Sequence, residues 1–284
     1  GISNISGNNT VGLSAAGLVN ITGDRTQGVI ISGLTSIGGD NTSGLMISGF
    51  MNVTGNMASG LHFSGAANIT GQSFGGLMAS GLLNVVGEHM NGLQMAGIAN
   101  ITASKLNGMQ IALCNYATQA RGLQIGLVNY YKEDMKGFQL GLVNANPDTR
   151  VQMMVYGGNA TPANIGVRFK NQLFYTILGI GSMYQGLNDK FSASASYRAG
   201  LSFTLYKGLS ISGDLGYQHI EAFDNKDEVI PKRLYALQAR ANLEYQFTRK
   251  FGIFATGGYG LTRFYNKSSN YDKGAIIEAG IVLF

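Results

Sequence analysis

The residues best suited to acid–base chemistry lie close together near the end of one strand-like segment. His219 is followed by Glu221 and Asp224, which gives an imidazole two carboxylates within reach. Such a group could serve as a general base in hydrolysis. A histidine among acidic loop residues is more often simply solvated, however, and no Ser/His/Asp constellation accompanies this one. The sequence therefore predicts no enzymatic activity.

A second set of polar side chains occupies alternate positions in the strand-like segments of the second half. These residues are Arg168, Arg198, Asp214, Gln238, Arg240 and Glu244. If their strands enclose an interior, the set points into it, and charges that are buried there must be paired. We therefore expect a polar core of ion pairs and hydrogen bonds. A narrow ion pathway and a catalytic site are the alternatives.

The composition argues against several other kinds of site. One Cys and three His exclude a disulfide framework and make a metal centre implausible, so no cofactor or metal is predicted. Cys114 is expected to be a small buried hydrophobe. The net charge of +5 comes from basic residues spread along the second half rather than gathered in one stripe. This spread predicts no nucleic-acid binding.

The chain has the composition of a glycine-rich β protein with few surface charges. Of its 284 residues, 42 are Gly and only 12% are charged, against about 25% in an average soluble domain. No apolar run approaches the roughly 18 residues that a membrane-spanning helix needs. Most of the charge lies in the second half of the chain. The sequence predicts two domains, residues 1–148 and 149–284.

The first domain is an internal repeat of 16 residues. One glycine series consists of Gly12, Gly28, Gly44, Gly60, Gly76, Gly92 and Gly108. An asparagine series runs in step with it, namely Asn4, Asn20, Asn52, Asn68, Asn84 and Asn100. Each unit can hold two short strands separated by turns, and it can bury apolar side chains only against neighbouring units. The repeat predicts a β-solenoid of ~16-residue coils, in which stacked inward asparagines form amide ladders.

Two uncharged columns of this repeat are expected to face outward. They contribute the candidate interaction face, which consists of Ile30, Met46, Met51, His62, Met78, Leu83 and Gln94. Apolar surface of this kind suggests burial against a partner. The alternative is that small coils simply expose some apolar atoms. The chain also opens in the middle of a repeat unit, which predicts an incomplete N-terminus.

The second domain alternates apolar and polar residues over long segments. Eight strands are predicted, at 150–158, 164–170, 173–184, 190–206, 208–223, 233–248, 252–265 and 275–284. Short turns alternate with longer loops, at 159–163, 185–189, 224–232 and 266–274. This pattern is typical of transmembrane barrels, so we expect an all-β chain that ends in an eight-stranded antiparallel transmembrane β-barrel. If Val282 and Phe284 face lipid, alternation points Glu278 outward too, which is unfavourable. A bulge that shifts the face, a contact with another protein and a position near the rim are the alternatives.

Two stretches resemble known bacterial envelope proteins. The run GLQIGLVNYYKEDMKGFQLGLVN resembles the glycine–leucine surface-repeat family, with residues 108–144 matching best and 12–107 more loosely. The ending Gly-Ile-Val-Leu-Phe resembles the recognition signal of outer-membrane barrels, and the strand count resembles the small OmpA/OmpX-type group. These resemblances imply an envelope location and nothing about chemistry.

The sequence thus predicts a structural protein anchored in the bacterial outer membrane by contact with its lipid. Its repeat solenoid is expected to dock on another envelope protein. Both ends of an even-stranded barrel lie on one side, and the terminal Phe284 marks that side as periplasmic, so we expect the solenoid in the periplasm. A surface-exposed, adhesin-like solenoid and a small pore or transport barrel are the alternatives.

Overall fold

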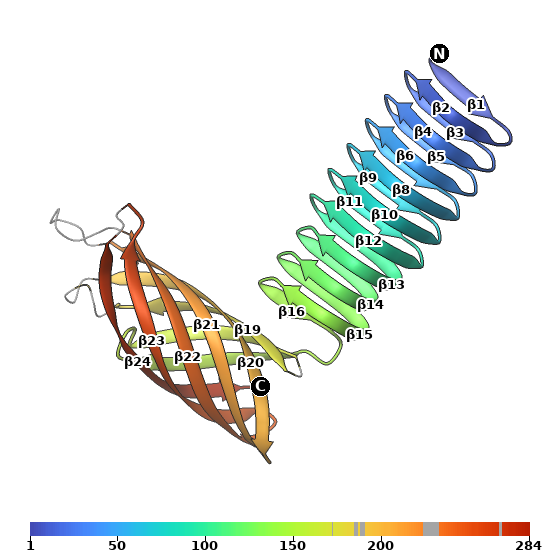
Figure 1. Cartoon of the computed structure of the whole chain (residues 1–284). Helices are drawn as coiled ribbons and strands as arrows, with labels where there is room; N and C mark the ends of the chain where they lie inside the picture. Colours follow the sequence, from blue (N-terminus) through green and yellow to red (C-terminus); the bar gives the residue numbers. More distant parts are fainter. Residues whose placement is uncertain (172, 185–186, 188–190, 224–232, 267–268) are drawn as a thin grey trace. The chain divides into compact units, whose positions relative to one another are not determined.

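A computed structural model of the chain shows two compact all-β units, Gly1–Pro147 and Asp148–Phe284 (Figure 1). The structure describes residues 1–171, 173–184, 187, 191–223, 233–266 and 269–284. Asp224 and most of the predicted loops 185–189 and 224–232 lie outside these ranges. The observed boundary falls one residue before the predicted one. Among the described residues, none belongs to a helix long and apolar enough to span a membrane.

The first unit is a β-solenoid, as the repeat predicts. Strands of four residues alternate with longer ones until the coils shorten. The strands are β1 (Ser3–Ser6), β2 (Thr10–Ala16), β3 (Val19–Thr22), β4 (Thr26–Ser32), β5 (Thr35–Gly38), β6 (Thr42–Ser48), β7 (Met51–Thr54), β8 (Met57–Ser64), β9 (Ala67–Thr70), β10 (Ser73–Ser80), β11 (Leu83–Val86), β12 (His89–Ala96), β13 (Ala99–Ile111), β14 (Cys114–Ile125), β15 (Val128–Leu140) and β16 (Val143–Ala145).

The coils stack in parallel and in register. In the longer strands Leu77 pairs with Leu61 on one side and with Leu93 on the other. The strand β13 bends across both faces of the stack and pairs with both β11 and β12. It thereby joins the two faces into one 16-stranded sheet. Equal coil lengths place identical repeat positions one above another, which is why the columns of the sequence become columns of the structure.

The interior of the solenoid is built largely from polar side chains, and the expected asparagine ladder is confirmed. Asn68 donates to Asn84 over 2.9 Å, and Asn84 donates to Asn100 over 2.9 Å. Asn84 also donates to the carbonyl of Met95 over 2.7 Å. The ladder continues through Asn115, Asn129 and Asn144. Asn100 and Asn115 likewise donate to carbonyls at the ends of longer strands, so the ladder satisfies backbone acceptors and fixes the register of the next coil.

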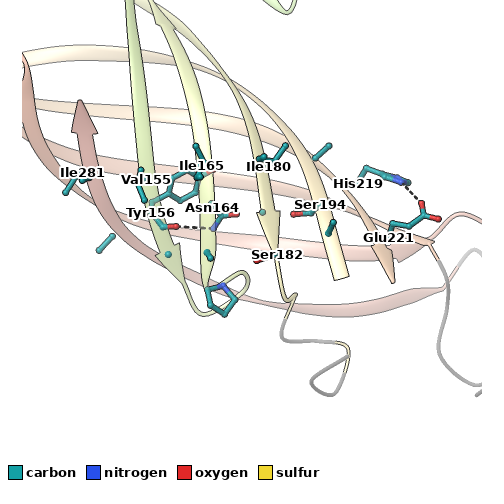
Figure 2. Close-up of a pocket in the computed structure, with 17 residues that line it drawn as sticks. Val155, Tyr156, Asn164, Ile165, Ile180, Ser182, Ser194, His219, Glu221 and Ile281 are labelled. Atoms are coloured by element: carbon teal, nitrogen blue, oxygen red, sulfur yellow. Dashed lines mark hydrogen bonds and ion pairs between the residues drawn. The ribbon is translucent and has the colours of Figure 1, made fainter. Parts of the chain in front are cut away.

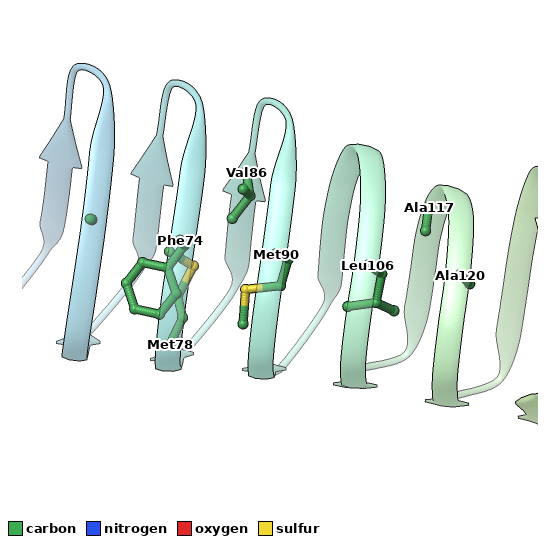
Figure 3. Packing of buried hydrophobic residues seen from close by; sticks show 8 residues of the cluster. Phe74, Met78, Val86, Met90, Leu106, Ala117 and Ala120 are labelled. Atoms are coloured by element: carbon green, nitrogen blue, oxygen red, sulfur yellow. The ribbon is translucent and has the colours of Figure 1, made fainter. Parts of the chain in front are cut away.

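An apolar cluster fills the middle of the solenoid (Figure 3). Its members are Ala58, Phe74, Met78, Val86, Met90, Leu106, Ala117 and Ala120. The expectation that the third repeat position faces outward is therefore wrong. Ile30, Met46, His62, Met78 and Gln94 are all buried. That column points inward because it lies two residues before the buried Ser32 and Ser48 column on the same strands, and successive side chains of a strand alternate between its faces.

The second unit is a closed eight-stranded antiparallel barrel, which confirms the predicted fold class. The strands are β17 (Arg150–Gly158), β18 (Ala163–Lys170), β19 (Phe174–Ser182), β20 (Ser192–Tyr206), β21 (Leu209–Ala222), β22 (Arg233–Thr248), β23 (Phe251–Phe264) and β24 (Asn270–Leu283). The first and last strands pair, with Met153 opposite Leu283, and close the barrel. The chain therefore begins and ends the barrel at the same end, which we call the turn end; the opposite end is the loop end.

The last strand faces the opposite way from the expected one. Val282 is buried inside the barrel, and so is Glu278, whereas Ile277 is largely exposed outside. Phe284 lies beyond β24 with a φ of 79°, so it does not continue the alternation of the strand. The expectation that Glu278 points outward is therefore wrong, and its carboxylate lies in the barrel interior.

Candidate functional site

All six polar residues predicted for the barrel interior are buried there, and they form two groups. In the first group, Arg168 from β18 donates through Nη2 to Oε1 of Glu244 on β22 over 2.9 Å. Its Nε donates to Oε1 of Gln152 over 2.9 Å. The contact with Glu244 crosses the barrel between strands that are not neighbours, whereas Gln152 lies opposite Arg168 on the paired strand β17, so the group ties the walls together at the turn end.

The second group lies deeper and is centred on Arg198. This guanidinium donates to both carboxylate oxygens of Asp214, at 2.9 Å each, which is the bidentate geometry of a strong pair. It also contacts Glu278 at 3.2 Å, and Arg240 contacts the other oxygen of Glu278 at 3.2 Å. Tyr175 donates to Asp214 over 2.7 Å. The sequence did not place Glu278 in this set, because the inward residues of β24 were inferred by counting back from Phe284.

The interior network separates two cavities at the ends of the barrel. One, of about 580 Å³, is lined at the turn end by Glu244 and Gln246, and the other, of about 490 Å³, is lined at the loop end by Gln238. Arg240 and Asn242 lie between these positions on β22 and are buried. Eight strands enclose a space that side chains nearly fill, and paired charges fill this one.

The outer surface of the barrel is a band of apolar side chains. Its middle is represented by Leu215 and Leu243, which are exposed. Aromatic residues gather near both ends. At the turn end these are Phe203, Tyr206, Tyr245, Phe247 and Phe251, and at the loop end they are Phe191, Tyr217, Phe223, Tyr235 and Tyr265. An apolar band between two aromatic girdles matches the cross-section of a bilayer.

His219 lies on the outer side of β21 at the loop end, in a chain of polar contacts. Its Nδ1 is 2.7 Å from the hydroxyl of Tyr265, and its Nε2 is 3.2 Å from Oε2 of Glu221. Arg233 then donates through Nε to Glu221 over 3.0 Å. Both ring nitrogens are therefore engaged by neighbours. Within the described ranges, no three His, Cys, Asp or Glu side chains converge on a position that could hold a metal ion.

The solenoid exposes an apolar column that sequence reasoning did not single out. It lies at the Ser-Gly corner, where each longer strand turns into the next short strand, and we call it the apolar edge. Its members are Leu18, Leu34, Phe50, Leu82, Ile98, Leu113, Leu127 and Leu142, each between 39% and 54% exposed. The signal was available in the sequence, because an apolar residue follows the repeat glycine that ends each Ser-Gly or Ala-Gly pair.

The surroundings of the apolar edge differ from the opposite corner of the coils. Met51 and Leu83, from the second predicted column, lie half-buried on the outer side next to it. Cys114 is exposed in the same column, contrary to the expectation that it is buried. The opposite corner carries exposed polar residues such as Arg25, Asn56 and Gln72. One side of the solenoid is thus apolar along its length, and the other is hydrophilic.

These features define a chain in which a β-solenoid is joined to an eight-stranded barrel with an apolar exterior. No protein-family model and no curated protein matches it. Solved structures with a similar fold include the N-terminal β-barrel domain of Pseudomonas aeruginosa OprF, at 18% identity and a TM-score of 0.35, covering 47% of this chain and 95% of that one. Another is Neisserial surface protein A, at 9% identity and a TM-score of 0.33, covering 47% and 93%.

Proposed function

We propose that this chain is an outer-membrane protein that presents its solenoid for docking on another envelope protein. The apolar edge is the observation that carries this proposal. It repeats the same kind of exposed side chain in almost every coil, and monomeric soluble proteins rarely expose long continuous apolar patches. A partner that covers this edge would remove a row of leucine-sized side chains from water, at about 25 cal/mol per Å².

The barrel supports the membrane part of the proposal. Its exterior is an apolar band between aromatic girdles, while its charges are paired inside. In a soluble barrel the same exterior would leave many large apolar side chains in water. In the outer membrane the exterior contacts lipid, and closure of the strands leaves no unpaired edge in the hydrocarbon.

The topology supports a periplasmic solenoid. The chain leaves β16 at Ala145 and starts β17 at Arg150, at the turn end of the barrel. Short turns of outer-membrane barrels face the periplasm, and Gly208 and Lys250 mark such turns here. The solenoid would then be a periplasmic module. A surface-exposed solenoid, as the resemblance to surface-repeat proteins implies, is the competing topology.

The docking role is tested by placing charge on the apolar edge. In the variant Leu82→Lys/Ile98→Lys, two exposed side chains of adjacent coils change, so the solenoid should keep its fold while docking is lost. Covalent cross-linking in cells, read as a discrete higher-mass band, should fall at least tenfold. The matched control Asn56→Lys/Gln72→Lys charges the opposite, hydrophilic corner and should keep the band. An undiminished band in the edge variant would contradict the proposal.

A further inference from the structure

A cavity of about 1060 Å³ lies on the outer surface of the barrel at the loop end (Figure 2). Its volume is slightly above the range found for small-molecule sites, about 300–1,000 Å³. It crosses β24, β17, β18, β19, β20 and β21, and its walls are mainly apolar. We call it the rim groove.

The rim groove exists because one outward row of the barrel consists of small side chains. Pairing places Gly157 opposite Ala279, Ser182 opposite Ala193, and Ala193 opposite Glu221. On β24, β17, β18 and β19 the next row toward the middle of the barrel is large, with Val155 opposite both Ile165 and Ile281, and Ile165 opposite Ile180. The rim groove is the space above the small row, bounded on one side by the larger side chains of the next row.

The groove has one polar end. Its small row runs into Glu221, which pairs with Arg233 on the next strand. His219, held between Tyr265 and Glu221, borders the same end. Arg233 lies just beyond the residues that line the groove; its side chain is 67% exposed, and its Nε donates to Glu221, which does line it. A guanidinium positioned in this way is suited to bidentate binding of phosphate.

We propose that the rim groove binds one phosphate-bearing membrane lipid, with an acyl chain against the small row and the phosphate at Arg233. A lipid chain inside the bilayer is already surrounded by hydrocarbon, so filling the groove gains little from the hydrophobic effect. Selectivity must therefore come from the polar end. The girdle residues Tyr217 and Tyr235 stack beside it, at the level where lipid headgroups meet the protein.

The inference uses the membrane position proposed above but not the docking role of the solenoid. If the barrel were not a membrane protein, the full chain would be soluble without detergent, which is seen before any lipid is added. The lipid site is tested by native mass spectrometry of the full chain in detergent. The probes are dimyristoylphosphatidic acid and its phosphate-free counterpart dimyristoylglycerol, each titrated separately.

The wild-type chain should form a one-lipid adduct with the phosphatidic acid at a concentration at least tenfold lower than with the diacylglycerol. Ala193→Leu fills the groove and should weaken that adduct about tenfold, and Ala279→Leu should do the same from the other end of the groove. The control Ala241→Leu enlarges an exposed alanine elsewhere on the barrel and should change nothing. Arg233→Gln should reduce binding of the phosphatidic acid to the level of the diacylglycerol.

Equal affinity of the wild-type chain for the two lipids would overturn the inference, as would unchanged binding by Ala193→Leu and Ala279→Leu. Inorganic phosphate is the remaining probe. If phosphate alone displaced the lipid at equal concentration, the site would be an anion site without a lipid component, and the inference would fail. Release of a fatty acid from the bound lipid would also overturn it, in favour of a hydrolase.

Discussion

His62 is a buried imidazole in the middle of the solenoid. It is 1% exposed, and its ring packs edge-on against Phe74 with 4.9 Å between centroids. Among the described residues its Nε2 has no hydrogen-bond partner. Burial lowers the pKa of His62 from its usual 6.5 to about 4, because the charged form would lose its hydration.

This burial predicts that the solenoid loses stability in mild acid. The unfolded chain binds a proton at His62 below about pH 6.5, whereas the folded chain does so only near pH 4. The free energy of unfolding should therefore fall as the pH drops through this window, by at most about 3 kcal/mol. His62→Met, which matches the neighbouring Met46 and Met78, should remove the loss. Hydrogen exchange in β8 at pH 7.5 and 4.5 measures it, and equal pH dependence in both proteins would contradict the assignment.

At the scale of elements, each longer solenoid strand depends on a glycine in the left-handed region. Gly76 in β10 has a φ of +128°, and a Cβ there would lie 2.2 Å from the carbonyl oxygen of Gly60 in the coil beneath. Its neighbour Gly75 has open space around the same position. Gly76→Ala should therefore unfold this coil or destabilise it by several kcal/mol, whereas Gly75→Ala should change stability by less than about 1 kcal/mol. The thermal unfolding midpoints of the two variants test this prediction. Similar midpoints would show that the coils do not stack closely enough at Gly76 to exclude a Cβ.

The strands of the barrel depend in turn on the central ion pairs. Removing Arg198 leaves Asp214 buried without its bidentate partner and Glu278 with Arg240 alone, a loss of about 3–5 kcal/mol for a broken buried pair. Arg198→Met should therefore lower the urea midpoint of the barrel in lipid vesicles. The matched variant Arg233→Met breaks the exposed pair with Glu221 and should cost about 1 kcal/mol or less. An equal effect of the two substitutions would show that the interior network is solvated.

The sequence was sufficient for elements whose repeat or alternation is long. The 16-residue period predicted the coils, and alternation predicted all eight barrel strands to within a few residues at most ends. It failed on which face of the longer solenoid strands is inside, whereas the inward asparagine column was predicted correctly. Hydrophobicity could not decide this, because the core holds Asn, Thr and Gln columns while the leucines of the apolar edge lie outside. The inward and outward residues of β24 were assigned wrongly because Phe284 was taken as part of the strand.

The candidate sites were predicted less completely than the fold. The six interior residues could be predicted because charged side chains on a membrane strand can face only the interior. Glu278 was missed because the inward residues of its strand were assigned wrongly. The rim groove could not be found from sequence. It depends on which small residues meet across six strands, and pairing register is a tertiary property that no local pattern contains.

At the scale of the whole molecule, both units bury polar networks and expose apolar surface, although the solenoid also holds an apolar cluster inside and exposes polar residues at its opposite corner. The barrel has paired charges in its interior and an apolar band on its exterior. The solenoid has amide ladders in its interior and an apolar edge on its surface. Such a distribution is stable only where something other than water covers the exterior. For the barrel the proposed cover is lipid, and for the apolar edge it is another envelope protein.

Thiol labelling in cells tests this account most directly, because the chain has a single cysteine, Cys114, beside the apolar edge. A membrane-impermeant maleimide is applied to intact and to permeabilised cells. The matched probe is Cys114→Ser/Gln72→Cys, with its thiol at the hydrophilic corner. The account predicts no labelling of either thiol in intact cells. After permeabilisation it predicts fast labelling at position 72 and labelling at least tenfold slower at Cys114. Rapid labelling of both thiols in intact cells would place the solenoid outside, and equal rates after permeabilisation would contradict docking.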